Sequence, residues 1–350
     1  MKIYSFRIFY TKMKRMFALF LAAFVLASGC TQSGKYYTID GYAQGGTYHI
    51  VADLPSASML ESLKDAVSDT LGAIDRSISG YNKGSLLSRF NNGENPGLDA
   101  IFVDIFNRSY EIWEESGGMF DPSSAPLFDL WGFGFTDGRE PSDEEVGAAL
   151  RLVGMDKFSL EESPDGSVRL NAPEGAALNF NAIAQGYSCD AVAEVLRRYG
   201  SVNYLVEIGG EIVCRGVNAK GKEWRVWIDK PVDGNNQSGA MKQDIVEITD
   251  CGLVTSGNYR KFYVVDGEKY SHTINPKTGR PVQHTLLSAT VLAPDSATAD
   301  AYATWLMVVG VEEAERVVEG WAVEPKGAYL VYGEQEAMKV WHTSGIKVSD

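Results

Sequence analysis

The sequence predicts an α+β protein in which mixed β-sheets pack against helices. Helical and strand-like segments follow one another irregularly, which argues against a strictly alternating, doubly wound parallel sheet. The 350 residues are 45% hydrophobic and 22% charged, which is enough to bury a large core. The 36 glycines exceed the roughly 7% of average usage and indicate many tight turns or close backbone approaches.

The N-terminal thirty residues predict a targeting segment. Lys12, Lys14 and Arg15 precede an apolar run over 17–27, which is too short to span a bilayer but has the length of a signal-peptide core. The run ends in Leu-Ala-Ser-Gly-Cys at Cys30, which resembles a bacterial lipobox. An ordinary buried cysteine after an N-terminal helix is the alternative.

This interpretation sets the expected organisation of the chain. We expect residues 1–29 to be removed as a lipoprotein signal peptide and Cys30 to carry the lipid. Residues 30–40 then contain the lipidated cysteine and a tether. Residues 41–350 form one domain.

Charge and cysteine usage exclude several functions. The 32 Lys and Arg against 46 Asp and Glu leave a net charge of −14, so the basic surface on which nucleic-acid binding depends is not expected. Beside Cys30, only Cys189, Cys214 and Cys251 remain, and this odd number allows at most one disulfide. The chain has four His and no Cys-x-x-Cys, hence no zinc signature. Any bound metal is expected to have oxygen ligands.

Hydrophobic periodicity predicts the order of the elements. A strand-like segment over 36–51 precedes an amphipathic helix whose apolar residues recur from Met59 to Ile78. Three further helices are predicted, over 101–115, 189–199 and 297–309. Strands are predicted over 203–208, 224–228, 245–249, 261–265, 288–292 and 328–332. The Gly-, Asn- and Gln-rich segment 232–243 is predicted to be a surface loop.

Six short segments carry glycine or polar residues that a core does not select. In the first, over 79–85, the amphipathic helix ends at Gly80, and Tyr81 either lies in solvent or stacks on an aromatic ligand. The second runs over 117–123 and is followed by 131–134. Its paired glycines either allow close approach to a ligand or form an ordinary turn.

Three more segments lie where we expect strands to open into loops. Residues 178–187 are interpreted as a strand entering a glycine turn and then a helix, whose first amides could receive phosphate oxygens. Residues 208–211 and 254–258 follow predicted strands. Each of these segments could equally be a plain structural turn or hairpin corner.

The sixth segment, 271–279, precedes a predicted helix that carries Asp300 and Thr304. These two residues are four apart and share one helix face, so a carboxylate and a hydroxyl can jointly hold a hard cation. The alternative is an aspartate that complements the helix dipole beside a packed threonine. His272 is either catalytic or an ordinary surface or core histidine.

Seven ordered motifs resemble the ApbE family of bacterial FAD:protein FMN transferases, over about residues 41–309. The motifs are Ser-x-Tyr at 79–81, Phe-Asp-Pro at 120–122, Ile-Ala-x-Gly-Tyr at 183–187, Gly-Gly-Glu at 209–211, Thr-Ser-Gly at 255–257, Ser-His-x-Ile-x-Pro-x-Thr-Gly at 271–279 and Ala-Asp-x-x-x-Thr at 299–304. The resemblance implies a lipoprotein on the periplasmic side of a bacterial membrane. It also implies FAD as substrate, Mg²⁺ as cofactor, and transfer of FMN to a Ser or Thr hydroxyl of a partner flavoprotein, such as a subunit of an Rnf- or Nqr-type redox pump.

The resemblance also implies roles for individual residues. Mg²⁺ is expected on the backbone carbonyl of Ala184 and the side chains of Asp300 and Thr304. FAD is expected to contact Gly45, Tyr81, Met119, Phe120, Asp121, Asn181, Tyr187 and Ile274. Two departures from the family pattern stand out. Gly45 replaces a frequent methionine, and the segment around Asn181 and Gln185 lacks a frequent acid and a frequent base.

Transfer of a phosphoryl group to a neutral hydroxyl needs a proton acceptor and local positive charge. We assign the proton acceptor to His272, because imidazole titrates near neutral pH, with Asp121 as the second candidate. Two other functions stay open from the sequence. One is an FAD pyrophosphatase that yields FMN and AMP, and the other is a noncatalytic FAD-binding lipoprotein.

Overall fold

The computed structural model describes residues 35–134, 139–232, 235, 241–259, 262–265, 268–335 and 337–349. The predicted signal peptide and Cys30 lie outside these residues. Strand β1 begins at Lys35, and residues 36–40 of the expected tether belong to the folded unit that begins at Tyr36.

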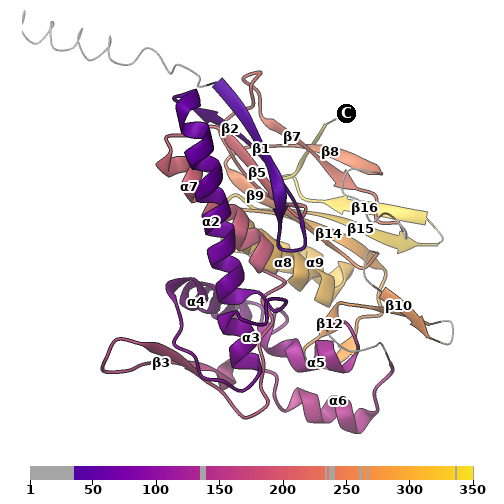
Figure 1. Cartoon of the computed structure of the whole chain (residues 1–350). Helices are drawn as coiled ribbons and strands as arrows, with labels where there is room; N and C mark the ends of the chain where they lie inside the picture. Colours follow the sequence, from indigo (N-terminus) through magenta and orange to yellow (C-terminus); the bar gives the residue numbers. More distant parts are fainter. Residues whose placement is uncertain are drawn as a thin grey trace, which may run out of the picture. The chain divides into compact units, whose positions relative to one another are not determined.

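An eight-stranded sheet forms the centre of this unit, in the order β1-β2-β5-β6-β9-β14-β15-β16 (Figure 1). Neighbouring strands from β2 to β16 pair antiparallel. The strands are β1 (Lys35–Ala43), β2 (Gly46–Leu54), β5 (Tyr204–Ile208), β6 (Glu211–Arg215), β9 (Cys251–Gly257), β14 (Leu286–Ala293), β15 (Gly327–Glu334) and β16 (Ala337–His342). Strand β14 is buried along nearly its whole length, as expected for a strand covered on both faces.

Helices cover one face of the sheet. Helix α8 (Ser296–Val309) packs on β9 and β14, and α7 (Ala184–Arg198) packs on β5 and β6 and against α8. The long α2 (Leu60–Ile78) packs on α7 through its stripe of Leu63, Val67 and Leu71 (Figure 1). This stripe is the periodicity that predicted the helix, and it joins the apolar cluster that also holds Val192 and Val206.

A second, small antiparallel sheet packs against the large one. Strands β7 (Trp224–Asp229), β8 (Lys242–Ile248) and β17 (Lys347–Ser349) form it in the order β17-β8-β7. Its Trp224 and Val246 share a buried cluster with Cys214, Cys251 and Leu292 of the large sheet. The two sheets therefore pack against each other through this cluster.

The remaining elements include one further long helix, α4, and several short helices and strands. They are η1 (Ala57–Met59), α3 (Leu86–Asn91), α4 (Ala100–Glu115), η2 (Pro122–Ser124), α5 (Ala125–Leu130), α6 (Asp143–Leu150), η3 (Met155–Lys157), β3 (Ser159–Glu162), β4 (Val168–Asn171), β10 (Phe262–Val265), β11 (Glu268–Ser271), β12 (Ile274–Asn275), β13 (Arg280–Pro281) and α9 (Val311–Gly320).

The α+β prediction is confirmed, and the four predicted helices and six predicted strands are all present. Two local predictions about strands are wrong. Residues 178–180 form no strand, and 254–257 lie inside β9 rather than after it. Most of the loop predicted over 232–243 lies outside the described residues, although Lys242 and Gln243 belong to β8.

The three cysteines of the described chain are buried and free. Cys214 and Cys251 are direct partners across the β6–β9 ladder, whereas Cys189 belongs to a different apolar cluster. The single pair that the cysteine count allows is therefore Cys214 with Cys251. A hydrogen bond with Cys251, together with burial, raises the pKa of the Cys214 thiol far above its ordinary value.

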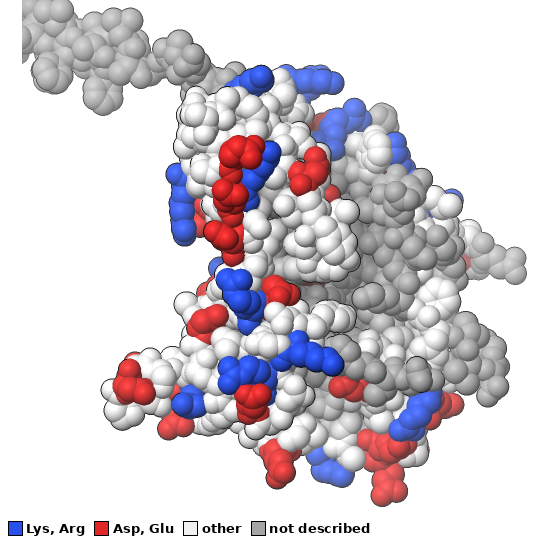
Figure 2. Space-filling view, viewed as in Figure 1, with Lys and Arg blue, Asp and Glu red and all other residues white. Residues whose placement is uncertain are grey.

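Charge on the described surface matches the acidic composition. Acidic and basic side chains are interspersed on the face shown in Figure 2, and the described part of this face carries no continuous basic surface. Within the described ranges, none of the helices combines the length and the hydropathy that crossing a bilayer requires.

Candidate active site

The N-terminal turns of α7 and α8 meet at the centre of the candidate site. Ser296 N and Ala297 N donate to the Asp190 carboxylate over 3.0 and 2.9 Å, and Asp295 caps α8 by accepting from Thr298 N. The Asp190 carboxylate therefore lies against the positive end of the α8 dipole. Burial and the nearby Asp295 nevertheless raise the pKa of Asp190 to about 7.

Gly186 explains why these helices come so close. It belongs to the first turn of α7, so the glycine turn predicted there is wrong. A Cβ built on Gly186 would overlap the backbone carbonyl of Ser296, and glycine is therefore the residue that this helix contact tolerates.

Gly186→Ala is expected to lower the free energy of unfolding by about 2 kcal/mol or more, because a backbone rather than a flexible side chain must give way. Gly147→Ala in α6 is the matched control. A Cβ there meets nothing within 4 Å, so alanine should stabilise the helix by about 0.5–1 kcal/mol. Urea unfolding measures the free energy of unfolding of both variants. If Gly186→Ala is as stable as the native protein, the close helix contact does not require glycine.

Asp300 is the buried acid of this junction. Its side chain is 4% exposed, and its Oδ2 accepts a hydrogen bond from Gly186 N over 3.1 Å. No Lys or Arg among the described residues forms an ion pair with it, and burial raises its pKa to about 7. An acid left in a core without a cationic side chain is well placed to bind a cation from solution.

Thr304 and Ala184 are the other two predicted cation ligands. Thr304 lies one turn after Asp300 on the same face of α8 and is half-buried. Ala184 begins α7 two residues before Gly186, and its carbonyl accepts a hydrogen bond from Ser188 Oγ over 2.7 Å. The structure thus brings the α7 start and Asp300 together, although they are far apart in sequence.

The oxygens of Asp300, Thr304 and Ala184 are suited to Mg²⁺, but they are too few to hold a metal ion without further ligands. The described residues contain no group of three or more His, Cys, Asp or Glu that could hold a metal. One carboxylate with a hydroxyl and a carbonyl leaves coordination positions open, which suits a cation that also binds water and substrate phosphates.

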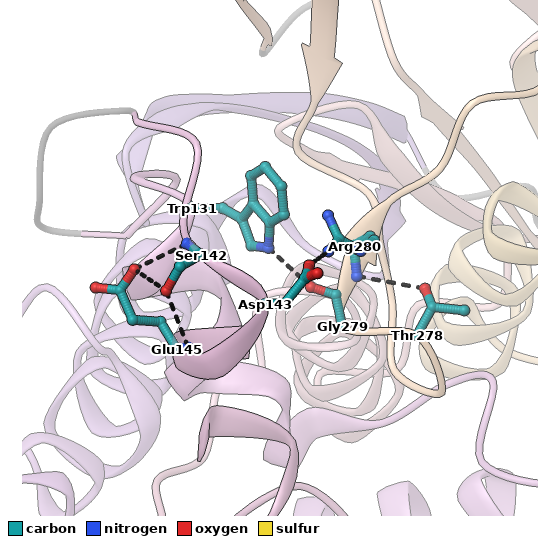
Figure 3. A network of polar contacts seen from close by, with 7 residues as sticks. All are labelled: Trp131, Ser142, Asp143, Glu145, Thr278, Gly279 and Arg280. Carbon is teal, nitrogen blue, oxygen red and sulfur yellow. Dashed lines mark hydrogen bonds and ion pairs between the residues drawn. The ribbon is translucent and has the colours of Figure 1, made fainter. Parts of the chain in front are cut away.

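The segment 279–280, which follows the His272 loop, is attached to helices α5 and α6. Trp131 Nε1 donates to Gly279 O over 2.8 Å, and Arg280 forms an ion pair with Asp143 (Figure 3). Asp143 begins α6, which Ser142 and Glu145 hold with reciprocal capping bonds (Figure 3). These contacts connect the end of the sixth motif to α5 and α6.

His272 itself lies between β11 and β12 and is half-buried. Its ring packs edge-on against Phe133, with 6.5 Å between centroids. The next residue, Thr273, donates to Asn258 Oδ1 over 2.6 Å, and Ile274 is buried in the core. Contact of Ile274 with a ligand would therefore be through its backbone, as the resemblance implies.

Asp121 has a structural task at the start of η2. Its Oδ1 accepts from Ser123 N over 2.9 Å and from Ser123 Oγ, and its Oδ2 accepts from Trp113 Nε1 over 3.1 Å. Burial raises the pKa of Asp121, against the lowering effect of these bonds and of Lys277. Both oxygens of the Asp121 carboxylate are therefore already engaged as acceptors.

The neighbours of Asp121 differ in their access to a ligand. Phe120 is 1% exposed inside the main core, so its side chain faces other core residues. Met119 is half-buried at the border of that core. Gly118, the second of the paired glycines, leaves room for Lys277, because a side chain at this position would overlap the lysine ammonium. Lys277 lies inside the sixth motif but was not among the predicted site residues.

The other predicted FAD contacts differ in exposure and in the elements that carry them. Tyr81 is 67% exposed, and Gly45 is exposed at the tip of the β1–β2 hairpin with φ of 79°. Asn181 is exposed just before α7. Tyr187 lies toward α4, where Arg108 sits over its ring and burial raises its pKa to about 12. The Tyr187 side chain therefore contacts α4.

The fold and the site define an α+β protein with buried carboxylates at the junction of α7 and α8 and a half-buried histidine between β11 and β12. The sequence model described as "ApbE family" matches residues 35–325, and the chain belongs to the ApbE family.

Relatives and solved structures agree with this assignment. The chain is 33% identical to the FAD:protein FMN transferase of Escherichia coli strain K12, over 93% of this chain and 95% of that protein. It is 35% identical to the FAD:protein FMN transferase of Vibrio cholerae, over 85% and 89%. The apo crystal structure of Pseudomonas stutzeri flavinyl transferase ApbE superposes with a TM-score of 0.77 at 31% identity, covering 91% of this chain and 97% of that one.

Proposed function

We propose that this protein is an enzyme that transfers FMN from FAD to a Ser or Thr hydroxyl of a partner protein, with Mg²⁺ as cofactor and AMP as leaving group. Its relatives carry the name FAD:protein FMN transferase. The observation that carries the proposal is the buried Asp300 carboxylate at the α7–α8 junction, which has a backbone amide beside it and no cationic side chain among the described residues.

The residues divide the chemistry between them. Asp300, Thr304 and the Ala184 carbonyl would hold Mg²⁺, which supplies the positive charge that a transferred phosphoryl group requires. His272 would take the proton of the attacking hydroxyl. Trp131 and Arg280 attach the segment 279–280, which follows the histidine loop, to helices α5 and α6.

Product analysis separates transfer from hydrolysis. The purified protein is incubated with FAD and Mg²⁺, with and without an acceptor, and FMN and AMP are quantified by chromatography. Transfer predicts AMP formation that depends on the acceptor, without an equal amount of free FMN. Equal FMN and AMP without acceptor would instead indicate a pyrophosphatase, and intact FAD a noncatalytic binding protein.

Cation binding is expected to strengthen as the pH rises toward 7 and then to level off. Asp300 has its pKa raised to about 7, so below that pH a proton occupies the carboxylate and competes with the cation. The expected loss approaches tenfold in affinity per pH unit well below 7. Mn²⁺ binding in the presence of FAD, followed by electron paramagnetic resonance, measures this without reporting on His272. A pH-independent affinity between pH 5 and 8 would contradict it.

The lipid anchor is also part of the proposal. The order of basic, apolar and small residues before Cys30 supports cleavage and lipidation there, and hence a position on the periplasmic side of a bacterial membrane. Acceptor subunits of Rnf- or Nqr-type redox pumps are the partners that the family resemblance suggests. Cys30→Ser is expected to move the protein from the membrane fraction to the soluble fraction, and an unchanged membrane fraction would contradict anchoring at Cys30.

A further inference from the structure

The tip of the β1–β2 hairpin reaches the candidate site through Gln44. This residue has a left-handed backbone, with φ of 52°, and it precedes Gly45 and Gly46. A Cβ built on Gly46 would lie 3.5 Å from the Cα of Gly209 in the β5–β6 turn. Gln44 Nε2 donates to Ser188 Oγ on α7 over 2.5 Å. Since Gly45 and Gly46 have no side chains, the Gln44 amide is the polar group that the hairpin tip presents to α7.

Ser188 fixes the orientation of this amide. Its single hydroxyl proton is donated to the Ala184 carbonyl over 2.7 Å. The hydroxyl can therefore only accept from Gln44, and an acceptor must face the NH₂ side of the amide. The opposite oxygen, Oε1, consequently points away from Ser188.

Gln44 Oε1 is buried and has no hydrogen-bond partner among the described residues. A buried acceptor without a donor is costly, on the order of 1–3 kcal/mol. Such atoms in a folded protein call for a donor that the protein alone does not supply. The position of Gln44, one hydroxyl away from the Ala184 carbonyl, places this acceptor beside the α7 start.

We propose that Gln44 is a substrate-binding residue whose Oε1 accepts a hydrogen bond from an N–H or O–H group of bound FAD. The inference rests on the proposed function, which makes FAD the ligand of this site. FAD offers suitable donors in its ribityl and ribose hydroxyls, the ring imide and the adenine amine. The hydrogen-bond chain from Ala184 through Ser188 holds the amide ready for this donor.

The test compares FAD binding and stability in the same variants. Gln44→Met keeps the length of the side chain and removes the amide, and it should raise the FAD dissociation constant by about tenfold. Thermal unfolding without FAD should shift by less than about 2 °C, because loss of the bond to Ser188 is offset by removal of the unsatisfied acceptor. Gln44→Gly, whose backbone suits φ of 52°, should show the same loss of FAD affinity.

Gln335→Met is the matched control, because Gln335 is also a left-handed glutamine, exposed after β15. Its FAD affinity should equal that of the native chain. Binding of FMN and of AMP to native and Gln44→Met proteins then identifies which half of FAD carries the donor, since only that half should lose affinity. If the native chain binds FAD and Gln44→Met and Gln44→Gly bind it equally well, this inference is wrong while the proposed function stands. If the native chain does not bind FAD, the proposed function itself fails.

Discussion

Asp300→Asn is expected to reduce Mg²⁺-dependent FMN transfer by at least about a thousandfold. Asparagine has nearly the same shape and can still accept from Gly186 N, but it removes the only charge that the predicted cation ligands provide. Loss of several kcal/mol of charge stabilisation corresponds to a rate effect of this size. Initial rates measured across a Mg²⁺ titration are the readout.

Two variants of the same helix serve as controls for Asp300→Asn. Asp295→Asn preserves the N-cap of α8, because asparagine caps as well as aspartate, and it should keep nearly full activity. Thr304→Ala should weaken Mg²⁺ dependence less than Asp300→Asn, since a neutral ligand contributes less charge. Full activity of Asp300→Asn at low Mg²⁺ would remove Asp300 from the cation site.

His272→Ala is expected to lower single-turnover FMN transfer by roughly two to four orders of magnitude at saturating FAD, which is the usual contribution of a general base. The FAD dissociation constant, measured by flavin fluorescence quenching, should change little. Asp121 is a weaker candidate for this role, because its two oxygens already accept three hydrogen bonds from Ser123 and Trp113.

The opposite pattern would assign His272 to binding. A raised FAD dissociation constant with nearly native saturated turnover would mean that the ring orients the substrate. Unimpaired transfer by His272→Ala would move the base role to Asp121 or to solvent. Asp121→Asn is a poor test by itself, because it also disturbs the cap of η2.

The sequence predicted the elements whose local pattern and tertiary environment agree. The apolar stripe from Leu63 to Ile78 is the face that α2 buries, so its period of 3.6 was visible in the chain. The segment 178–180 misled the prediction, because an apolar run can be buried in the core without pairing in a sheet. Whether an apolar segment forms a strand or is buried without one depends on the part of the chain that packs against it.

The candidate site was predictable only where it is local in sequence. Asp300 and Thr304 share a helix face, which their spacing alone revealed. Gly186 was taken for a turn residue because its true constraint, the carbonyl of Ser296, lies far away in the chain. The contact of Gln44 with Ser188 spans 144 positions and left no sequence signal.

Covalent flavinylation of an acceptor protein is the central claim, and intact-mass spectrometry tests it most directly. The native protein is incubated with FAD, Mg²⁺ and a candidate acceptor, and the acceptor is then denatured and weighed. The account predicts an acceptor heavier by one FMN joined through a phosphodiester to a Ser or Thr, with no adduct when EDTA or the Asp300→Asn variant is used. An acceptor of unchanged mass beside free FMN and AMP would contradict protein flavinylation and leave hydrolysis of FAD as the reaction.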